Sequence, residues 1–334
     1  KRGYMRWWHS FQGICPTTQE TRTFFVEYSI LNPALGTSQP ILGQHPYYKR
    51  HGLKPSYLCI KAGVFPEPED SGLQLRAYYP LTSLQVAQDP FYMQFEDCVY
   101  SENRISGSID ISDEVARHRS LMTDAGSFIW DLEVHKAVAC HTGYIANAFF
   151  TAVHALESFC HGEVIRTFFR GTVILNGVTY EVTPETSYGY ADKHWGRSYN
   201  QPWLQFASGH LISEKTGREL KHSALAIDGC CPEFFPMRRR ILMQLTYTGE
   251  DFEYHFGRPL TLSRCKWKVK ETNKRFIWHF KAQNRTSVVR ISGSCSKEQM
   301  MPLLYESPDG KVSDIPLWEG GNATGTIELY RRIG

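Results

Sequence analysis

Short segments in which apolar and polar residues alternate recur along most of this chain. Thr23–Ile30, Phe128–Val134 and Ser263–Lys270 are three of them, and aromatic and β-branched residues are frequent in each. A period of two belongs to strands with one buried face, because successive side chains point to opposite sides of a sheet. The segments follow one another about every ten residues, a spacing typical of barrels and sandwiches. The sequence therefore predicts an all-β fold.

Turn residues between these segments predict where the chain reverses. Asn176-Gly177 separates Arg170–Leu175 from Val178–Val182, and both turn residues readily adopt a positive φ, so a tight hairpin is expected there. A second hairpin is expected across residues 101–104. Further strands are expected at 23–30, 91–100, 103–111, 128–134, 203–210, 220–227, 240–246, 252–256, 263–270, 275–282, 287–292 and 325–330.

The length of 334 residues exceeds what one hydrophobic core usually supports, so two domains are expected. The alternation is interrupted at 36–54, which looks like a loop rich in Pro and Gly, and at 137–163. The second interruption is a candidate for a helical turn or a crossover between domains. We place the boundary there, with an N-terminal domain at 1–160 and a C-terminal domain at 161–334.

Composition narrows the functional classes. Aromatic residues make up 13% of the chain, which suits either the lining of a large apolar pocket or the filling of two β cores. The net charge of +3 provides no global field to capture nucleic acid. Nine cysteines without a Cys-x-x-Cys pair indicate neither a zinc cage nor a small disulfide framework, and they predict reduced thiols in a cytoplasmic protein.

The sequence motifs of several other functional classes are missing from this chain. No apolar run reaches the ~18 residues of a membrane helix, and the first residues lack the apolar stretch of a signal peptide. The histidines at 135, 141, 154 and 161 are spaced too irregularly for a zinc motif. No nucleophile elbow, phosphate loop or dinucleotide fingerprint occurs. We therefore expect no metal, no cofactor, no nucleic acid partner and no integral membrane segment.

Reactive side chains are densest between Glu185 and Gln205. If this part is extended, Tyr190, Asp192 and His194 share one face of a strand. An Asp and a His two residues apart then form an acid–base pair, and burial beside aromatic rings raises the pKa of Asp192, so that it keeps a proton for donation. The alternative is a solvated corner at Asp-Lys-His, with the next aromatic residue plugging the core.

Several segments resemble the tocopherol cyclase-like family. Tyr190-Ala-Asp-Lys-His-Trp-Gly196 is similar to its Tyr-Ser-Glu-Lys-Asn-Trp-Gly element and to the Asp/His-x-Trp-Gly elements of lipocalin-like carotenoid hydratase and pericyclase relatives. Thr23–Ala34 resembles an early strand that ends in Asn-Pro-Ala, Gln201–Gln205 a tryptophan-rich strand, and Gly325–Arg332 a closing Gly-x-x-x-Leu-x-x-x-Arg. The matches occur in family order over nearly the whole chain.

The resemblance implies two lipocalin-like, calycin-type β-barrel or sandwich domains packed together, with a pocket near their interface and the motif on the C-terminal domain. It also implies chemistry on prenylated or polyene substrates without a redox cofactor. Asp192 would be the proton donor, and Lys193 and His194 would orient it or tune its pKa. Two departures bear on this transfer, since the family's Glu is Asp192 here and its Asn is His194.

The resemblance also implies a substrate-binding set. Trp195 and Trp203 would stabilise positive charge through their π faces, and Tyr190 and Gln205 would bind a phenol or carbonyl end. Trp8, Tyr28, His45 and Tyr188 complete the set. Trp8 is alternatively a packing residue at a barrel end, and His45 a surface residue on the loop 36–54.

Two functional hypotheses follow. The first is a cofactor-independent cyclase or isomerase that protonates an alkene or enol of a hydrophobic, unsaturated small molecule, such as a prenylated phenol, polyene or terpenoid. A scaffold that shapes a polyene without proton transfer is a weaker variant of it. The second is a non-catalytic lipocalin-like carrier or sensor of an apolar ligand, because barrels of this kind bind ligands without chemistry.

Overall fold

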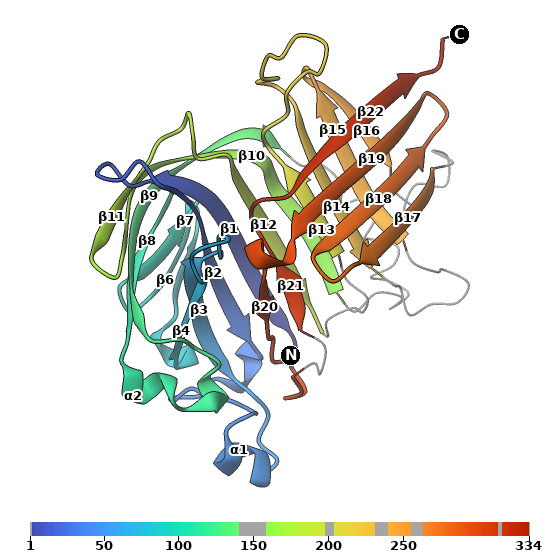
Figure 1. The fold of residues 1–334 in the computed structure, drawn as a ribbon. Coiled ribbons are helices and arrows are strands. Elements are labelled where there is room, and N and C mark those ends of the chain that lie inside the picture. The colour runs from blue at the N-terminus through green and yellow to red at the C-terminus, as the bar shows by residue number, and fades with distance from the viewer. Residues whose placement is uncertain are drawn as a thin grey trace.

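The computed structural model describes residues 2–139, 158–197, 204–230, 240–254, 263–312 and 316–333. The structure is 60% strand and 8% helix, which confirms the predicted all-β fold. A barrel built from the first part of the chain stands beside smaller sheets from the second part (Figure 1). No helix in the described ranges is long and apolar enough to cross a membrane.

Twelve strands form the barrel sheet. They are β1 (Tyr4–Ile14), β2 (Thr21–Leu31), β3 (Tyr57–Val64), β4 (Leu73–Tyr79), β5 (Gln85–Gln88), β6 (Phe91–Phe95), β7 (Cys98–Ser101), β8 (Arg104–Ile111), β9 (Gly126–Ala139), β10 (Ser158–Leu175), β11 (Val178–Val182) and β12 (Gly189–Gly196). The order is β4-β3-β2-β1-β11-β10-β9-β8-β7-β6-β5, and β12 pairs with both β1 and β10.

The interior of the barrel is filled mainly by aromatic and branched side chains, among them Phe24, Phe128 and Phe169. Tyr28 is fully buried here, where its hydroxyl donates to the Val99 carbonyl at 2.7 Å and accepts from Trp130 Nε1 at 3.1 Å. These bonds satisfy the one polar group that the tyrosine brings into the core.

The second part of the chain forms a sandwich. One four-stranded sheet contains β13 (Leu204–Ser208), β14 (Ala224–Cys230), β15 (Arg240–Tyr247) and β16 (Glu250–Tyr254), and the other contains β17 (Arg264–Glu271), β18 (Arg275–Gln283), β19 (Ser287–Ser296) and β22 (Thr324–Arg331). Ile227 and Met243 of the first sheet share a core with Trp278 and Val289 of the second.

A small two-stranded sheet lies between barrel and sandwich (Figure 1). It consists of β20 (Met301–Leu303) and β21 (Leu317–Glu319). Met301 and Leu303 pack with Trp8, Phe25 and Phe65, so this sheet covers the outside of the barrel.

Most predicted turns and strands are present. The hairpin at Asn176-Gly177 is confirmed, and both residues have positive φ, 48° and 82°. The hairpin across 101–104 joins β7 to β8. The single strand predicted at 91–100 was wrong, because a turn with Glu96 at φ 54° divides it into β6 and β7. Pairing of such short strands keeps one aromatic face toward the barrel interior.

The two predicted interruptions differ in outcome. Segment 36–54 contains one short helix, α1 (Pro46–Arg50), which the loop prediction missed. Most of 137–163, namely 140–157, lies outside the described residues. The division at 160/161 stays a prediction, and the position falls within β10, which pairs with β9 in the barrel sheet.

Candidate functional site

The motif strand β12 lies between β1 and β10, with Asp192 opposite Trp8 of β1. Its side chains alternate as predicted. Tyr190, Asp192 and His194 share the outer face of the barrel, where they contact one another or the same partner, Gln205 of β13. The extended structure of 190–195 is thereby confirmed, and the solvated corner is excluded, since Asp192 is 1% exposed and His194 3%.

Asp192 is the centre of this group. Its Oδ2 lies 3.3 Å from His194 Nε2 and accepts a hydrogen bond from Gln205 Nε2. The Gln205 amide also donates to the Tyr190 hydroxyl at 2.6 Å. The second carboxylate oxygen, Oδ1, is buried without a hydrogen-bond partner among the described residues. Buried polar atoms without a partner are uncommon in folded proteins, so this oxygen needs a physical reason.

The protonation of Asp192 differs from the prediction. Burial raises the pKa of this carboxyl, but the nearby charges of His194 and Arg6 and the hydrogen bond from Gln205 outweigh burial, and the net pKa lies below its ordinary value. The expected rise was therefore wrong, since it counted burial and omitted the charged neighbours. The Asp192 carboxyl group is therefore ionised at neutral pH.

A row of five buried residues, four of them charged, crosses five strands on this outer face of the barrel, and we call it the charged row. Register aligns Asp192 of β12, Trp8 of β1, Glu27 of β2, Lys61 of β3 and Arg76 of β4. Each of the five is less than a tenth exposed. Side chains directly opposite on adjacent strands lie close enough to interact, so the row links the motif to charges far from it in sequence.

Glu27 neutralises the middle of the row. Its carboxylate lies 2.9 Å from Lys61 Nζ and 3.2 Å from Arg6 NH1, and it accepts a bond from the Tyr305 hydroxyl at 3.1 Å. Burial raises the pKa of Glu27, but the cations Lys61 and Arg6 outweigh it and lower the pKa below the ordinary value. For Lys61 burial dominates and lowers the pKa to about 8, although Glu27 opposes the shift.

The β20–β21 sheet, which covers the outside of the barrel, adds a further acidic residue to this site. The Tyr305 hydroxyl also lies 3.3 Å from Glu319 Oε1 at the end of β21, and the Tyr305 ring lies 3.6 Å from Lys61 Nζ. Burial raises the pKa of Glu319 to about 7, against the lowering effect of Arg6 and Lys61. Glu319 is thus a carboxyl that holds its proton close to neutrality.

An apolar wall adjoins these charges. Trp8 stacks on Phe25 with ring centroids 5.1 Å apart and 9° between the planes, and Phe65 packs against both. Tyr190 and Met301 belong to the same cluster. Trp8, one of the predicted binding residues, therefore lies beside Asp192 as well as in a packed layer.

Other predicted residues lie elsewhere. Lys193 points to the opposite side of β12, where its Nζ is 4.9 Å from the ring of Trp7 in the barrel core and 5.9 Å from that of Trp195. The predicted cooperation of Lys193 with Asp192 is contradicted by this alternation, since adjacent residues of a strand face opposite ways. Trp195 likewise faces away from the carboxylate.

The remaining members of the predicted set are dispersed. Tyr28 is enclosed in the barrel core, Tyr188 stacks on His210 with ring centroids 4.0 Å apart, and His45 caps α1 by accepting from the Tyr47 amide. Trp203 lies outside the described residues. The structure therefore brings together Tyr190, Asp192, His194, Gln205 and Trp8 from the predicted site.

Sequence reasoning missed Arg6, Glu27, Lys61, Tyr305 and Glu319. A signal for two of them was present. Glu27 interrupts the apolar run of β2, and Lys61 interrupts β3, in which every residue is buried. A charge that replaces an apolar residue within such a run is costly unless a partner neutralises it, so it marks a buried ion pair. In the described ranges no group of three potential metal ligands occurs.

Comparison with known proteins is limited to distant structures. No family model matches this chain, and no curated protein does. A protein assigned as AttH from Nitrosomonas europaea matches 97% of this chain and 92% of its own, with 11% identity and a TM-score of 0.45. CghA in complex with Sch210972 matches 99% and 88%, with 9% identity and a TM-score of 0.46. Both are too distant to inform the chemistry, and membership of the tocopherol cyclase-like family stays a prediction.

Proposed function

We propose that this protein is a cofactor-independent isomerase or cyclase that transfers protons to and from a hydrophobic, unsaturated small molecule at Asp192 and His194. One observation carries the proposal. Asp192 is a fully buried, ionised carboxylate with an uncommitted oxygen, held 3.3 Å from a histidine and beside an aromatic wall. Buried charged groups with specific charged partners cluster at functional sites, where the chemistry needs them.

We assign the acid role to His194 in place of Asp192, because the lowered pKa of Asp192 leaves it without a proton to donate. The imidazolium Nε2–H bond breaks as a C–H bond forms on an alkene or enol, and positive charge develops on the substrate. The π faces of Trp8 and Phe25 and the Asp192 carboxylate stabilise that charge. Asp192 Oδ1 then removes a proton from the adjacent carbon, which completes an isomerisation. Transfer of that proton from Asp192 to His194, 3.3 Å away, restores both groups. In a cyclisation, a substrate hydroxyl closes the ring, and its proton returns to His194.

The polar end of the substrate would be bound by residues of the β20–β21 sheet and the segment between its strands. Glu319, whose pKa is raised to about 7, lies 3.3 Å from the Tyr305 hydroxyl, which itself donates to Glu27. A hydrogen bond from the protonated Glu319 carboxyl would orient a phenol or carbonyl oxygen. Since the cluster is buried, entry requires the β20–β21 sheet to move outward from the barrel.

The test is native mass spectrometry after incubation with a panel of prenylated phenols and polyenes, followed by analysis of the released ligand. Wild-type protein is compared with Asp192→Asn and His194→Asn. The control is Asp131→Asn, a change in a carboxylate that is more than half exposed on the barrel surface. We expect all four proteins to bind the ligand, and only wild type and control to convert it.

Two results would contradict the proposal. Full conversion by folded Asp192→Asn would remove the carboxylate from the chemistry. A ligand that every protein binds and releases unchanged would favour the alternative function, a carrier or sensor of apolar ligands.

A further inference from the structure

The outer face of the sheet β17–β18–β19–β22 is strongly basic. Alternation along the strands sends Trp267, Trp278 and Phe280 into the sandwich core and leaves charged residues on the other side. This face carries seven lysines and arginines and one carboxylate, Glu328. The cations are Arg264, Lys266, Lys268, Lys270, Arg275, Lys281 and Arg290.

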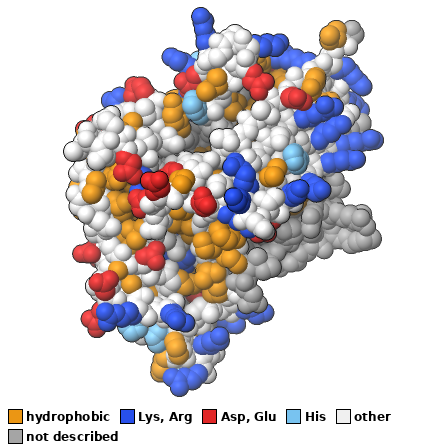
Figure 2. Space-filling view, viewed as in Figure 1, with side chains coloured by type: hydrophobic (Ala, Val, Ile, Leu, Met, Phe, Trp, Pro, Cys, Tyr) orange, Lys and Arg blue, Asp and Glu red, His pale blue; other side chains and the backbone are white. Residues whose placement is uncertain are grey.

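The basic face contrasts with the rest of the chain. Its net charge of +6 exceeds the +3 of the whole protein, so the remaining residues are net negative. Blue side chains accordingly gather over this sheet (Figure 2). A field concentrated on one face orients the molecule toward an anionic partner, even though the total charge is small.

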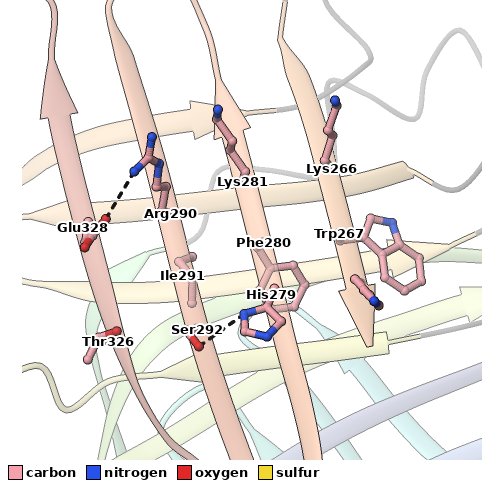
Figure 3. Close-up of a pocket in the computed structure, with 11 residues that line it drawn as sticks. Lys266, Trp267, His279, Phe280, Lys281, Arg290, Ile291, Ser292, Thr326 and Glu328 are labelled. Atoms are coloured by element: carbon pink, nitrogen blue, oxygen red, sulfur yellow. Dashed lines mark hydrogen bonds and ion pairs between the residues drawn. The ribbon is translucent and has the colours of Figure 1, made fainter. Parts of the chain in front are cut away.

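Register places cations directly opposite one another. Lys266, Lys281 and Arg290 form a row across three adjacent strands, and Glu328 follows on β22 (Figure 3). Like charges opposite each other destabilise a sheet. The one acidic contact of the row is Arg290 to Glu328 at 3.9 Å, and Lys266 and Lys281 have no acidic partner among the described residues. The fold thus keeps a repulsion that an external anion would relieve.

An open hollow of about 420 Å³ lies along this row. Phe280 and Ile291 also line it, although their side chains point into the sandwich core, and His279, which lies 3.3 Å from the Ser292 hydroxyl, stands below Lys281 (Figure 3). Lysine ammonium groups are compact charges on long stems and suit contacts with phosphate oxygens at variable positions. The positively charged lining of the hollow is therefore suited to binding phosphate groups.

The arrangement favours a lipid surface over a nucleic acid. The cations spread in two dimensions, about 4.8 Å apart between strands and about 6.7 Å apart along them, like the headgroups of a bilayer. Single-stranded nucleic acid binding relies on aromatic platforms for the bases. The aromatic rings exposed on this face among the described residues are Tyr330, which is engaged by Arg290 at 5.4 Å and by Glu328, and His279, which lies 3.3 Å from the Ser292 hydroxyl. Neither is an open platform for a base.

We propose that the β17–β18–β19–β22 face docks the protein on membranes that contain anionic phospholipid, with headgroup phosphates seated on the Lys266–Lys281–Arg290 row. Each lysine or arginine near an anionic bilayer adds to the affinity, and seven are enough for peripheral binding without an inserted helix. The proposal does not depend on the chemistry at Asp192.

The experiment is cosedimentation of the full chain with vesicles of phosphatidylcholine, alone or mixed with phosphatidylserine. The test protein carries Lys266→Gln, Lys281→Gln and Arg290→Gln. A matched control carries the same charge change at exposed positions elsewhere, Arg119→Gln, Lys215→Gln and Lys221→Gln. We expect binding only to the mixed vesicles, a loss of about a hundredfold in the test protein, little loss in the control, and weakening by salt.

Four results would overturn the proposal. They are equal binding to neutral vesicles, equal losses in test and control proteins, complete displacement from vesicles by inorganic phosphate at low concentration, and preferential binding of a DNA or RNA oligonucleotide by the same three residues. The last two would assign the face to a free anion or to nucleic acid. Circular dichroism of both triple variants verifies that the sheet is intact.

Discussion

Replacing Glu27 by glutamine is expected to destabilise the protein by about 3–5 kcal/mol, because it leaves two buried cations without their anion. The Glu27 carboxylate lies 2.9 Å from Lys61 and 3.2 Å from Arg6, and all three side chains are at most 5% exposed. Glutamine retains the shape and one acceptor oxygen, so the loss reports charge and not packing. The measurement is urea unfolding at neutral pH, followed by tryptophan fluorescence.

The matched control is Asp131→Asn. Arg104 donates two hydrogen bonds to Asp131, both at 2.9 Å, so the geometry is at least as good as at Glu27. Here, however, the side chains are 57% and 55% exposed. Water and salt screen such a pair, and we expect its loss to cost about 1 kcal/mol or less.

A double variant separates charge from burial. In Glu27→Gln with Lys61→Met, one of the two stranded cations is replaced by an apolar side chain of similar length, and part of the lost stability should return. The reasoning would be refuted if Glu27→Gln cost no more than Asp131→Asn. It would be refuted equally if the double variant were less stable than the single one.

Three further predictions concern pH and packing. Burial raises the pKa of Glu306 from 4.5 to about 7. Its contribution to stability is therefore fully present below about pH 4.5 and is lost as the pH rises through 7. Between pH 5 and 8, the unfolding free energy of wild type should fall by about 3 kcal/mol more than that of Glu306→Gln, and parallel pH profiles would contradict this. Gly63→Ala should cost about 2 kcal/mol or more, because the new Cβ would lie 1.9 Å from the Leu73 carbonyl oxygen; an unchanged melting temperature would refute the packing. Trp130→Phe removes the 3.1 Å hydrogen bond to Tyr28 and should cost about 1–3 kcal/mol in urea unfolding, whereas a neutral effect would show that the bond contributes nothing.

Local patterns predicted the strands well because each follows from its own residues. The exposed and buried positions of β9 alternate along most of its length, and the Asn176-Gly177 turn has the positive φ values that these residues allow. The same patterns failed at Glu96, where a left-handed residue interrupts a run rich in aromatic residues. Glu96 and Asp97 are weak strand formers and mark the position only faintly, whereas the pairing of β6 with β7 shows the turn.

The orientation of the candidate site residues could be predicted from the sequence, but the pKa of Asp192 could not. Alternation alone places Asp192 and His194 on one face and Lys193 on the other. The pKa of Asp192, by contrast, depends on Arg6 and Gln205, which reach it through strand pairing and through contact between barrel and sandwich. Such long-range pairing is not encoded in the spacing of residues, so an argument from burial alone gave the wrong direction.

The charged row on the outside of the barrel has a consequence for biosynthesis. Barrel strands leave the ribosome before the strands that later cover them, and N-terminal units generally fold first. A barrel flank carrying Glu27, Lys61 and Arg76 is wettable at that stage, so the half-made protein exposes fewer adhesive apolar patches to other nascent chains. The later contact forms by exchanging hydration water for Tyr305 and its neighbours. Met301 and Leu303 add apolar contacts to the same cover, so the polar row and the aromatic wall are buried in one step.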